Sequence, residues 1–522
     1  MAEQQEKVRD THPGETGEDE ALREAPDESQ DEAQDEPIKS RKNGLYGEIS
    51  DELAQSMRSG WADTERDGLE PSGQAPYAAK RRKALSAAFP GERLVIPSGT
   101  LKQRSNDTDY PFRASCDYVY LTGDQTENSV LILEPSAEGG HRAVVYLLPR
   151  SDRETGEFWL SGYGELWVGR RNSLTEAAAI LGLETGDSRQ VAERLAEALA
   201  ADPTVVTRIL AGHDAALDEL LAQAGAGADE QSGQAAQERD DQLRVFLHGL
   251  RLVKDEWEIE QLRRACASTA EGFRDVVAEL SRAIATSERW IEGTFFRRAR
   301  VAGNDVGYGS ICAAGPHATT LHWVRNDGPV RPGELLLLDA GVETDTLYTA
   351  DVTRTLPISG EFSELQRTVY QAVYDAQEAG IAAVRPGNRY RDFHEAAQRV
   401  LVERLVEWGL LEGPAERAYE LGLHRRYTLH GTGHMLGLDV HDCAHARVED
   451  YVDAELVPGM VLTVEPGLYF QPDDLTVPEE YRGIGVRIED DILVTATGNE
   501  NLSGALPRSA PDVERWMSEF GG

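Results

Sequence analysis

Hydrophobic and polar positions follow two different patterns along the chain, and the first pattern predicts a mixed helix and strand region. Between residues 76 and 245, short apolar runs such as SVLILEP and RAVVYLLP are interspersed with alanine-rich stretches such as LTEAAAILGL and VAERLAEALA. Short apolar runs are typical of buried strands, whereas the alanine-rich stretches have the spacing of amphipathic helices. We therefore expect a smaller α/β domain in this part of the chain.

The second pattern begins with a long amphipathic stretch, DEWEIEQLRRACASTAEGFRDVVAELSRAI, whose apolar positions recur at helical spacing. It marks the start of a second domain that runs to the end of the chain. Residues 224–241 are small, polar and charged, which predicts a mobile surface insertion. We expect a tail over 1–44, an N-terminal α/β domain over 45–245 and a second domain over 246–522.

An internal repeat is the most informative feature of the second domain. PGELLLLDAG (332–341) and PGMVLTVEPG (458–467) share one frame: Pro-Gly, five mostly apolar residues, an acid, one residue and a glycine. Asp339 and Glu465 therefore occupy equivalent positions at the end of a strand-like run.

A second pair of segments repeats in the same order. DVTRTLPISG (351–360) and EDDILVTATG (489–498) each place an acid nine residues ahead of a glycine, so that Asp351 corresponds to Glu489. Such a pattern is expected from an internal duplication whose two halves face each other across a pseudo-twofold axis.

The four repeated acids predict a metal site. Any one acid at a strand end is as often an exposed turn residue. Here, however, each acid ends or interrupts an apolar run (LLLLD, VLTVE, VRIED), and burial of a carboxylate is costly unless it is paired or binds metal. The obvious basic neighbours, Arg354 and Arg487, are too few to balance four acids. Two divalent cations would balance them.

Three histidines lie in HGTGHMLGLDVHD (430–442). A helical zinc motif fits this stretch poorly, because Gly431 and Gly433 would each cost about 1 kcal/mol in a helix, and Gly431 stands where that motif needs a glutamate. We expect a loop and a strand. His434 is our candidate fifth ligand, since oxygen-rich sites with one imidazole suit manganese, cobalt or iron.

The remaining histidines are candidates for the reaction itself. Hydrolysis needs hydrogen-bond donors to a carbonyl oxygen that becomes negatively charged, and His430, His441 and His322 (in TLHW) could supply them. Each of the three alone is equally compatible with a structural role.

Composition narrows the class of protein. The formal net charge of -39 argues against nucleic acid or an anionic membrane as a partner. The acidic stretch 1–36 has almost no large apolar side chains and is expected to be disordered. The sequence has no signal peptide, membrane span or CxxC pair. It also lacks GxSxG, GxxxxGK[ST] and GxGxxG motifs. We expect a soluble cytoplasmic protein.

Several motifs resemble those of the metallopeptidases with the pita-bread fold, and in particular bacterial aminopeptidase P (Xaa-Pro aminopeptidase). They are DAG with ADVTRT, HGTGHMLGLDVHD, TVEPGLY and YRGIGVRIEDD. SNDTDYPFRASCDYVYLTG resembles the N-terminal region of that family, and ELWVGRR its following strand and turn. The resemblance covers about residues 85–510. It implies an α+β protein whose C-terminal pita-bread domain has an internal pseudo-twofold duplication and follows a smaller α/β domain.

The resemblance also implies a ligand set and a reaction. Asp339 would bind one metal ion, Asp351 and Glu489 would bridge both, and His434 and Glu465 would complete the second. The ions would be two divalent metals, with manganese expected. A hydroxide between them would attack the peptide bond before proline, so the enzyme would be an aminopeptidase that releases the N-terminal residue of Xaa-Pro peptides.

Further roles follow from the same resemblance. Glu465 would shuttle a proton and His441 would hold the carbonyl oxygen, while His322 and His430 would line the substrate pocket. Arg487 would hold the carboxylates.

Trp167 matches a tryptophan that reaches into a neighbouring subunit's site in tetrameric relatives, so we expect a homodimer or homotetramer. The alternatives are an Xaa-Pro dipeptidase (prolidase) and a non-catalytic binding protein with the same fold.

Overall fold

The computed structural model describes residues 50–225 and 230–521, so the predicted tail over 1–44 lies outside the described residues. The chain divides into two compact units: a smaller one that contains residues up to Glu65 together with Arg150–Asn172, and a larger one that contains the rest. Within the described ranges, no helix combines the length and the apolar character needed to cross a membrane. The helices of the smaller unit are α1 (Asp51–Met57), α4 (Glu157–Leu160) and α5 (Glu165–Val168). Because ELWV forms α5, our expectation of a strand at ELWVGRR is wrong.

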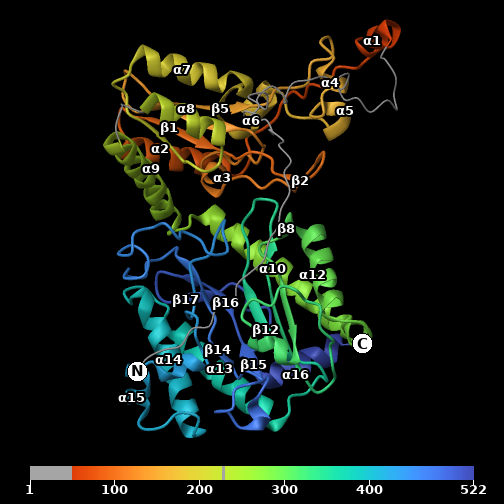
Figure 1. Cartoon of the computed structure of the whole chain (residues 1–522), viewed down its shortest axis with the longest axis vertical. Helices are drawn as coiled ribbons and strands as arrows, with labels where there is room; N and C mark the ends of the chain where they lie inside the picture. Colours follow the sequence, from red (N-terminus) through yellow and green to blue (C-terminus); the bar gives the residue numbers. More distant parts are fainter. Residues whose placement is uncertain (1–49, 226–229, 522) are drawn as a thin grey trace, which may run out of the picture. The chain divides into compact units, whose positions relative to one another are not determined.

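The N-terminal part of the larger unit is a mixed sheet in the order β6-β5-β4-β1-β7, in which β1 pairs with β7 and β5 with β6 in parallel. Leu94 and Ile96 face a core that includes Leu85 of α2, whereas Val95 between them faces a core that includes Leu195 of α7. This alternation places helices on both faces, as Figure 1 shows. The α/β expectation is therefore confirmed for this region. The strands are β1 (Arg93–Pro97), β4 (Val130–Pro135), β5 (His141–Leu147), β6 (Glu184–Asp187) and β7 (Thr207–Ile209), beside a hairpin of β2 (Gln103–Ser105) and β3 (Thr108–Asp109). The helices are α2 (Ala75–Ala88), α3 (Cys116–Thr122), α6 (Leu174–Leu181), α7 (Val191–Ala201), α8 (Ala215–Gly225) and α9 (Glu230–Arg251), with a 3₁₀ turn η2 (Ser188–Gln190).

Helix α9 corrects one expectation. Residues 230–241, which we assigned to a mobile surface insertion, form its first half as regular helix, while residues 226–229 lie outside the described ones. Glutamine, alanine and glutamate, which favour helices, make up more than half of residues 230–241.

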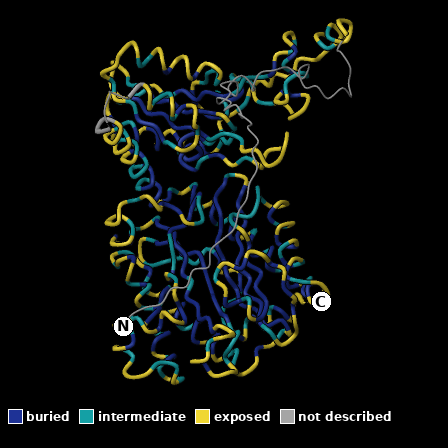
Figure 2. The backbone as a smooth tube through the Cα atoms, in the orientation of Figure 1, coloured by how far each residue is buried: buried dark blue, intermediate teal, exposed yellow. Residues whose placement is uncertain are grey.

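The C-terminal part begins with α10, which forms as the amphipathic stretch predicts. In the first half of the C-terminal part, α10 and α12 pack against a sheet of order β12-β10-β9. Apolar side chains of these elements belong to one buried core, and Figure 2 draws in dark blue the backbone of residues that are buried. The helices are α10 (Glu256–Ala278), α11 (Leu280–Ala285) and α12 (Glu288–Ala302). The strands are β8 (Asp305–Val306), β9 (Ile311–Ala314), β10 (Leu335–Ala340), β11 (Val342–Glu343) and β12 (Val352–Pro357), with a 3₁₀ turn η3 (Gly315–Thr319).

The second half repeats this plan with a helix pair, α13 and α14, and a sheet of order β13-β16-β17. Met435 forms an isolated bridge with Leu462 of β13, so its segment takes the place that β9 has beside β10. The internal duplication therefore extends from the sequence motifs to the strand order. The helices are α13 (Glu364–Ala383), α14 (Tyr390–Glu407), α15 (Ala415–Glu420) and α16 (Ala510–Phe520), with 3₁₀ turns η4 (Leu423–Arg426) and η5 (Glu479–Tyr481). The strands are β13 (Val461–Val464), β14 (Gly467–Tyr469), β15 (Gly485–Arg487), β16 (Asp490–Val494) and β17 (Asn499–Asn501).

Candidate metal centre

The first two acids lie at one end of the β10 and β12 pair. Asp339 is paired with Thr353 in the antiparallel ladder, and Asp351 immediately precedes β12. Both side chains are buried, and the Tyr308 hydroxyl contacts both, at 2.6 Å from Asp339 Oδ1. The strand pairing thus brings together two acids that are separated by a turn in the sequence.

The other two acids occupy the equivalent place in the second half. Val464 of β13 is paired with Asp490 of β16, so Glu465 and Glu489 lie directly beyond the last pair. The Thr353 hydroxyl donates a hydrogen bond of 2.7 Å to Glu489 Oε2. This contact connects the two halves at the point where their acids meet.

His434 completes the group from the segment beside β13. Its Nε2 lies 3.2 Å from Asp351 Oδ2 and 3.8 Å from Glu465 Oε1. A Cβ on the preceding Gly433 would lie 2.0 Å from the carbonyl oxygen of Thr463, so only glycine allows this close approach. Ligand atoms of Asp351, His434 and Glu489 all lie within 4.8 Å of one another.

The cluster contains too few basic groups to neutralise its acids. Arg487 is buried, contacts Asp339 and donates to Thr353 Oγ1 at 3.1 Å. Arg354, the other basic neighbour in the sequence, binds the Asp490 carboxylate and the backbone carbonyl of Glu489, but none of the four predicted ligand carboxylates. Among the described residues, Arg487 is the one guanidinium that contacts a side chain of the predicted ligands.

The pKa values reflect this imbalance. Burial, together with the charges of Asp351 and Glu465, raises the pKa of Glu489 well above its ordinary value, and burial raises that of Glu465 to about 7. Burial alone would lower the pKa of His434, but its hydrogen bond to Asp351 raises it to about 9. The protein itself thus leaves a concentration of negative charge that favours bound cations.

His430 belongs to a hydrogen-bond chain beside the acids. Arg487 donates to the Tyr469 hydroxyl at 3.0 Å, and that hydroxyl lies 2.8 Å from His430 Nε2. His430 Nδ1 lies 2.7 Å from the carbonyl oxygen of Gly431, which assigns the ring proton to Nδ1. Burial and the charge of Arg487 lower the pKa of His430 to about 4, so its imidazole is neutral at neutral pH.

The other predicted histidines lie close by. The ring of His441 packs edge-on against that of His434, with centroids 4.4 Å apart. His322 is exposed, and burial lowers the pKa of His441. Trp167 is not part of this cluster: it lies in α5 of the smaller unit, where it is 62% exposed and its indole N–H donates to the carbonyl of Trp159 at 2.8 Å.

Three residues of the centre were missed in the sequence. Tyr308 has no local signal, because it precedes Asp339 in an irregular segment. Thr353 could have been found, since it lies two positions after Asp351 and so shares its strand face. Tyr469 follows the acid motif in TVEPGLY and could have been noted with it.

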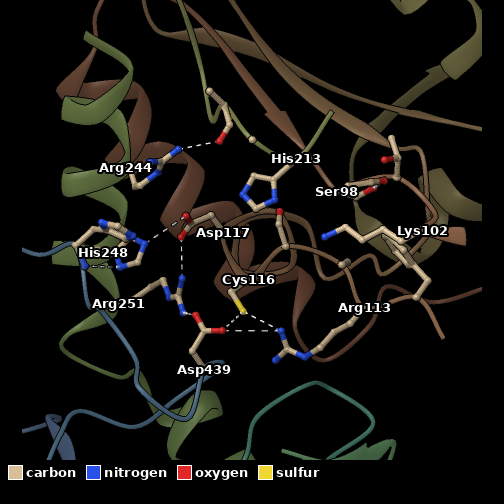
Figure 3. Close-up of a pocket in the computed structure, with 18 of the residues that line it drawn as sticks. Ser98, Lys102, Arg113, Cys116, Asp117, His213, Arg244, His248, Arg251 and Asp439 are labelled. Atoms are coloured by element: carbon tan, nitrogen blue, oxygen red, sulfur yellow. Dashed lines mark hydrogen bonds and ion pairs between the residues drawn. The ribbon is translucent and has the colours of Figure 1, made fainter. Parts of the chain in front are cut away.

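A second cluster lies on the other side of the segment that carries His441. Arg251 of α9 contacts Asp442 and binds Asp439 at 2.8 Å and Asp117 at 2.9 Å, and Lys254 Nζ lies 2.9 Å from Asp442 Oδ2. Figure 3 shows Arg251 between Asp117 and Asp439. Arg251, Asp117 and Asp439 border a cavity of about 610 Å³ that none of the five predicted ligands lines.

Comparison with known families gives two matches along the chain. Residues 260–496 match the model of metallopeptidase family M24, and residues 78–206 match that of the aminopeptidase P N-terminal domain. The two matched ranges lie within the two predicted domains.

Individual relatives match over nearly the whole chain. Xaa-Pro aminopeptidase 1 of Streptomyces coelicolor is 67% identical over 97% of this chain and 99% of its own length. The Xaa-Pro aminopeptidase of Escherichia coli is 32% identical over 84% of this chain and 96% of its own length. A solved structure of an Escherichia coli aminopeptidase P variant in complex with substrate has a TM-score of 0.75 at 31% identity and covers 86% of this chain and 99% of that one.

Proposed function

Because the chain belongs to metallopeptidase family M24, we propose that it is a metal-dependent aminopeptidase that removes the N-terminal residue from peptides with proline in second position. The observation that carries this proposal is the convergence of three buried carboxylates, the partly buried Glu465 and one imidazole from the two halves of the C-terminal domain. Relatives named Xaa-Pro aminopeptidase, which match almost end to end, support the substrate class. The predicted α+β fold, with a pita-bread domain after a smaller α/β domain, is confirmed by the family matches and by the solved structures.

The residues of the centre fit a pair of divalent ions. Four carboxylates and one imidazole are mainly oxygen ligands, for which manganese is well suited. Asp339, Asp351, His434, Glu465 and Glu489 would hold the ions, with Asp351 and Glu489 shared between them. When bound, such ions activate water as a nucleophile and polarise the scissile carbonyl.

The protein's own groups would orient the substrate and move its protons. The Glu465 carboxylate would accept a proton from the attacking water and pass it to the departing amine. Its Oε2 lies 3.6 Å from Nδ1 of the neutral His430 ring. His441 would donate to the carbonyl oxygen as charge develops there. His322 and His430 would line the pocket for the substrate, and Arg487 would hold Asp339 in place.

The chemistry also suits proline. A peptide bond to proline is a tertiary amide without an N–H, so proteases that hold this group by a hydrogen bond lose a contact. Attack by activated water needs no donor at that nitrogen. The prolidase alternative shares the same ligands, but the N-terminal domain match favours the aminopeptidase.

Three further expectations complete the proposal. We propose that the domain boundary expected between residues 245 and 246 lies a few residues later, after Arg251, because α9 continues to that residue. We also propose that the protein is cytoplasmic, in keeping with four unpaired cysteines. We also propose a homodimer or homotetramer in which the exposed Trp167 enters a neighbouring subunit's site. Light scattering of the native protein and of Trp167→Ala, together with their rates, tests the assembly.

The decisive experiment compares manganese-loaded protein on matched Xaa-Pro and Xaa-Pro-Yaa peptides. Release of the first residue from the tripeptide is expected. Strong turnover of the dipeptide alone would instead identify a dipeptidase. A protein that binds no metal and cleaves neither peptide would be a non-catalytic member of the family.

A further inference from the structure

The segment that connects β9 to β10 carries His322, one of the proposed substrate residues. His322 itself is exposed, whereas Trp323 beside it is buried. The position of the His322 imidazole therefore depends on what holds the neighbouring backbone.

A single buried carboxylate binds this segment at several points. Glu288, the first residue of α12, has a fully buried side chain. Each of its oxygens accepts two hydrogen bonds. Oε1 lies 2.8 Å from both the Ala314 N–H nitrogen and His317 Nδ1, and Oε2 lies 2.9 Å from Trp323 Nε1 and 2.7 Å from the Gly328 nitrogen.

The backbone reinforces the same connection. The Glu288 N–H donates to the carbonyl oxygen of Gly328 at 2.9 Å, so helix and segment exchange a pair of hydrogen bonds. A Cβ on Gly328 would lie 2.2 Å from the His317 ring and 2.9 Å from Glu288 Oε2, so the close approach requires glycine. Carboxylate and segment are thus packed without space for rearrangement.

Trp323 is fixed on its ring face as well as at its N–H. His317 stacks on its ring with centroids 3.8 Å apart and an interplanar angle of 22°, and the guanidinium of Arg325 lies 4.3 Å from the ring centroid. Side-chain contacts therefore hold the residue next to His322, while His322 is left to face the substrate.

We propose that Glu288 is a positioning residue for the peptidase reaction: through the Trp323 indole it fixes the backbone that presents His322 to the substrate. The inference rests on the proposed function, in which His322 lines the substrate pocket. A carboxylate that only capped α12 would bind the helix's own N–H groups. All four side-chain hydrogen bonds recorded for Glu288 instead come from residues 314–328.

Trp323→Phe tests this, because phenylalanine keeps a six-membered aromatic ring and loses the pyrrole ring with its N–H. The control is Trp290→Phe in α12, the helix of Glu288; its indole N–H donates at 2.9 Å to Glu279, which lies between α10 and α11, away from the segment. We expect Trp323→Phe to lower kcat/KM by about tenfold, because small displacements of a group beside the reacting atoms are amplified in the rate. The control should change it by less than about twofold. Metal content should be unchanged in both.

A second readout does not depend on activity. In protein with isotope-labelled histidine, the NMR signal of His322, assigned by its loss in His322→Ala, should shift in Trp323→Phe and stay in place in Trp290→Phe. Glu288→Gln, in which an NH₂ group faces two N–H donors, should shift it further. An unmoved His322 signal, or a rate within about twofold of wild type, would overturn the proposal. If the signal shifts but wild-type protein cleaves no Xaa-Pro peptide, the positioning holds and the proposed function fails.

Discussion

Two clusters of buried acids flank the segment that carries His441, and they are neutralised in different ways. In the metal centre, four carboxylates share the guanidinium of Arg487. In the second cluster, Arg251 and Lys254 bind the acids directly. One cluster is therefore short of positive charge and the other supplies its own.

Asp442 and Glu489, one acid from each cluster, have pKa values that are shifted in opposite directions. Burial by itself raises the pKa of both Asp442 and Glu489. For Asp442 the charges of Arg251 and Lys254 prevail and bring the pKa far below its ordinary value, whereas that of Glu489 stays well above. A buried acid with a lowered pKa has its cation within the protein, and one with a raised pKa is a candidate to bind a cation from solution.

The largest effect is expected when a shared ligand of the metal centre is removed. Asp351→Ala and Glu489→Ala should each lower activity by about 10⁴-fold or more, because several kcal/mol of transition-state stabilisation depend on the ions. Metal analysis of the purified variants should show loss of both ions. Thermal unfolding of metal-free Glu489→Ala should show no loss of stability, since the raised pKa of Glu489 means that the metal-free fold disfavours its charged form. A variant that keeps both ions would contradict the shared-ligand role.

In the second cluster, by contrast, removal of an acid is expected to lower the stability of the fold. Asp442→Ala leaves Arg251 and Lys254 buried without their shared partner, which should lower the free energy of unfolding by about 3–5 kcal/mol. Urea denaturation measures this. The control is Asp345→Ala, whose exposed pair with Arg264 should contribute less than about 1 kcal/mol. Equal effects of the two substitutions would remove the distinction between the clusters.

His441 connects the clusters and should show an intermediate effect. Its ring packs on His434, while Asp439 and Asp442 on either side are held by Arg251. His441→Ala should lower kcat by about 10²-fold through loss of a donor to the carbonyl oxygen. Metal content should stay normal. A near-normal rate would refute that role.

The sequence predicted the acids of the centre because strand ends in a repeat must meet where the strands pair. Asp339 and Glu465 ended similar apolar runs, and the ladders of β10 and β13 place both at equivalent ends. Gly433 next to His434 likewise marked a backbone that approaches its neighbour closely. The spacing of these residues along the sequence is enough to predict their positions.

The features that the sequence did not predict depend on long-range contacts or on the face of the strand to which a side chain points. Arg354 looked like a partner of the acids, but it alternates with Thr353 along β12 and so points to the opposite side, where it binds Asp490. Tyr308 contacts two ligands only because the sheet brings it there. We predicted the structure of residues 230–241 from their polarity. They form a helix because of their helix propensity and the packing of α9.

The change per pH unit is the smallest step we expect to measure: a pH dependence of metal binding that belongs to the metal centre alone. Glu465, with its pKa raised to about 7, and His434, with its pKa raised to about 9, hold protons in the metal-free protein below those values. Each must lose its proton to bind an ion, so the apparent affinity should rise with pH between about 6 and 9, by up to about tenfold per pH unit for each proton released. Calorimetric titration of metal-free protein with Mn²⁺ at several pH values, in buffers of different ionisation enthalpy, counts these protons.

His445→Gln, on the second cluster's side, serves as the control for that titration and should keep the same slope. Asp442 in that cluster is already ionised throughout this range, because its pKa is lowered, and it has no proton to release. The slope should therefore decrease when His434 or Glu465 is replaced, and most when both are replaced. An affinity that is independent of pH in the wild-type protein would mean that its own cations neutralise the metal centre as fully as Arg251 and Lys254 neutralise the other cluster.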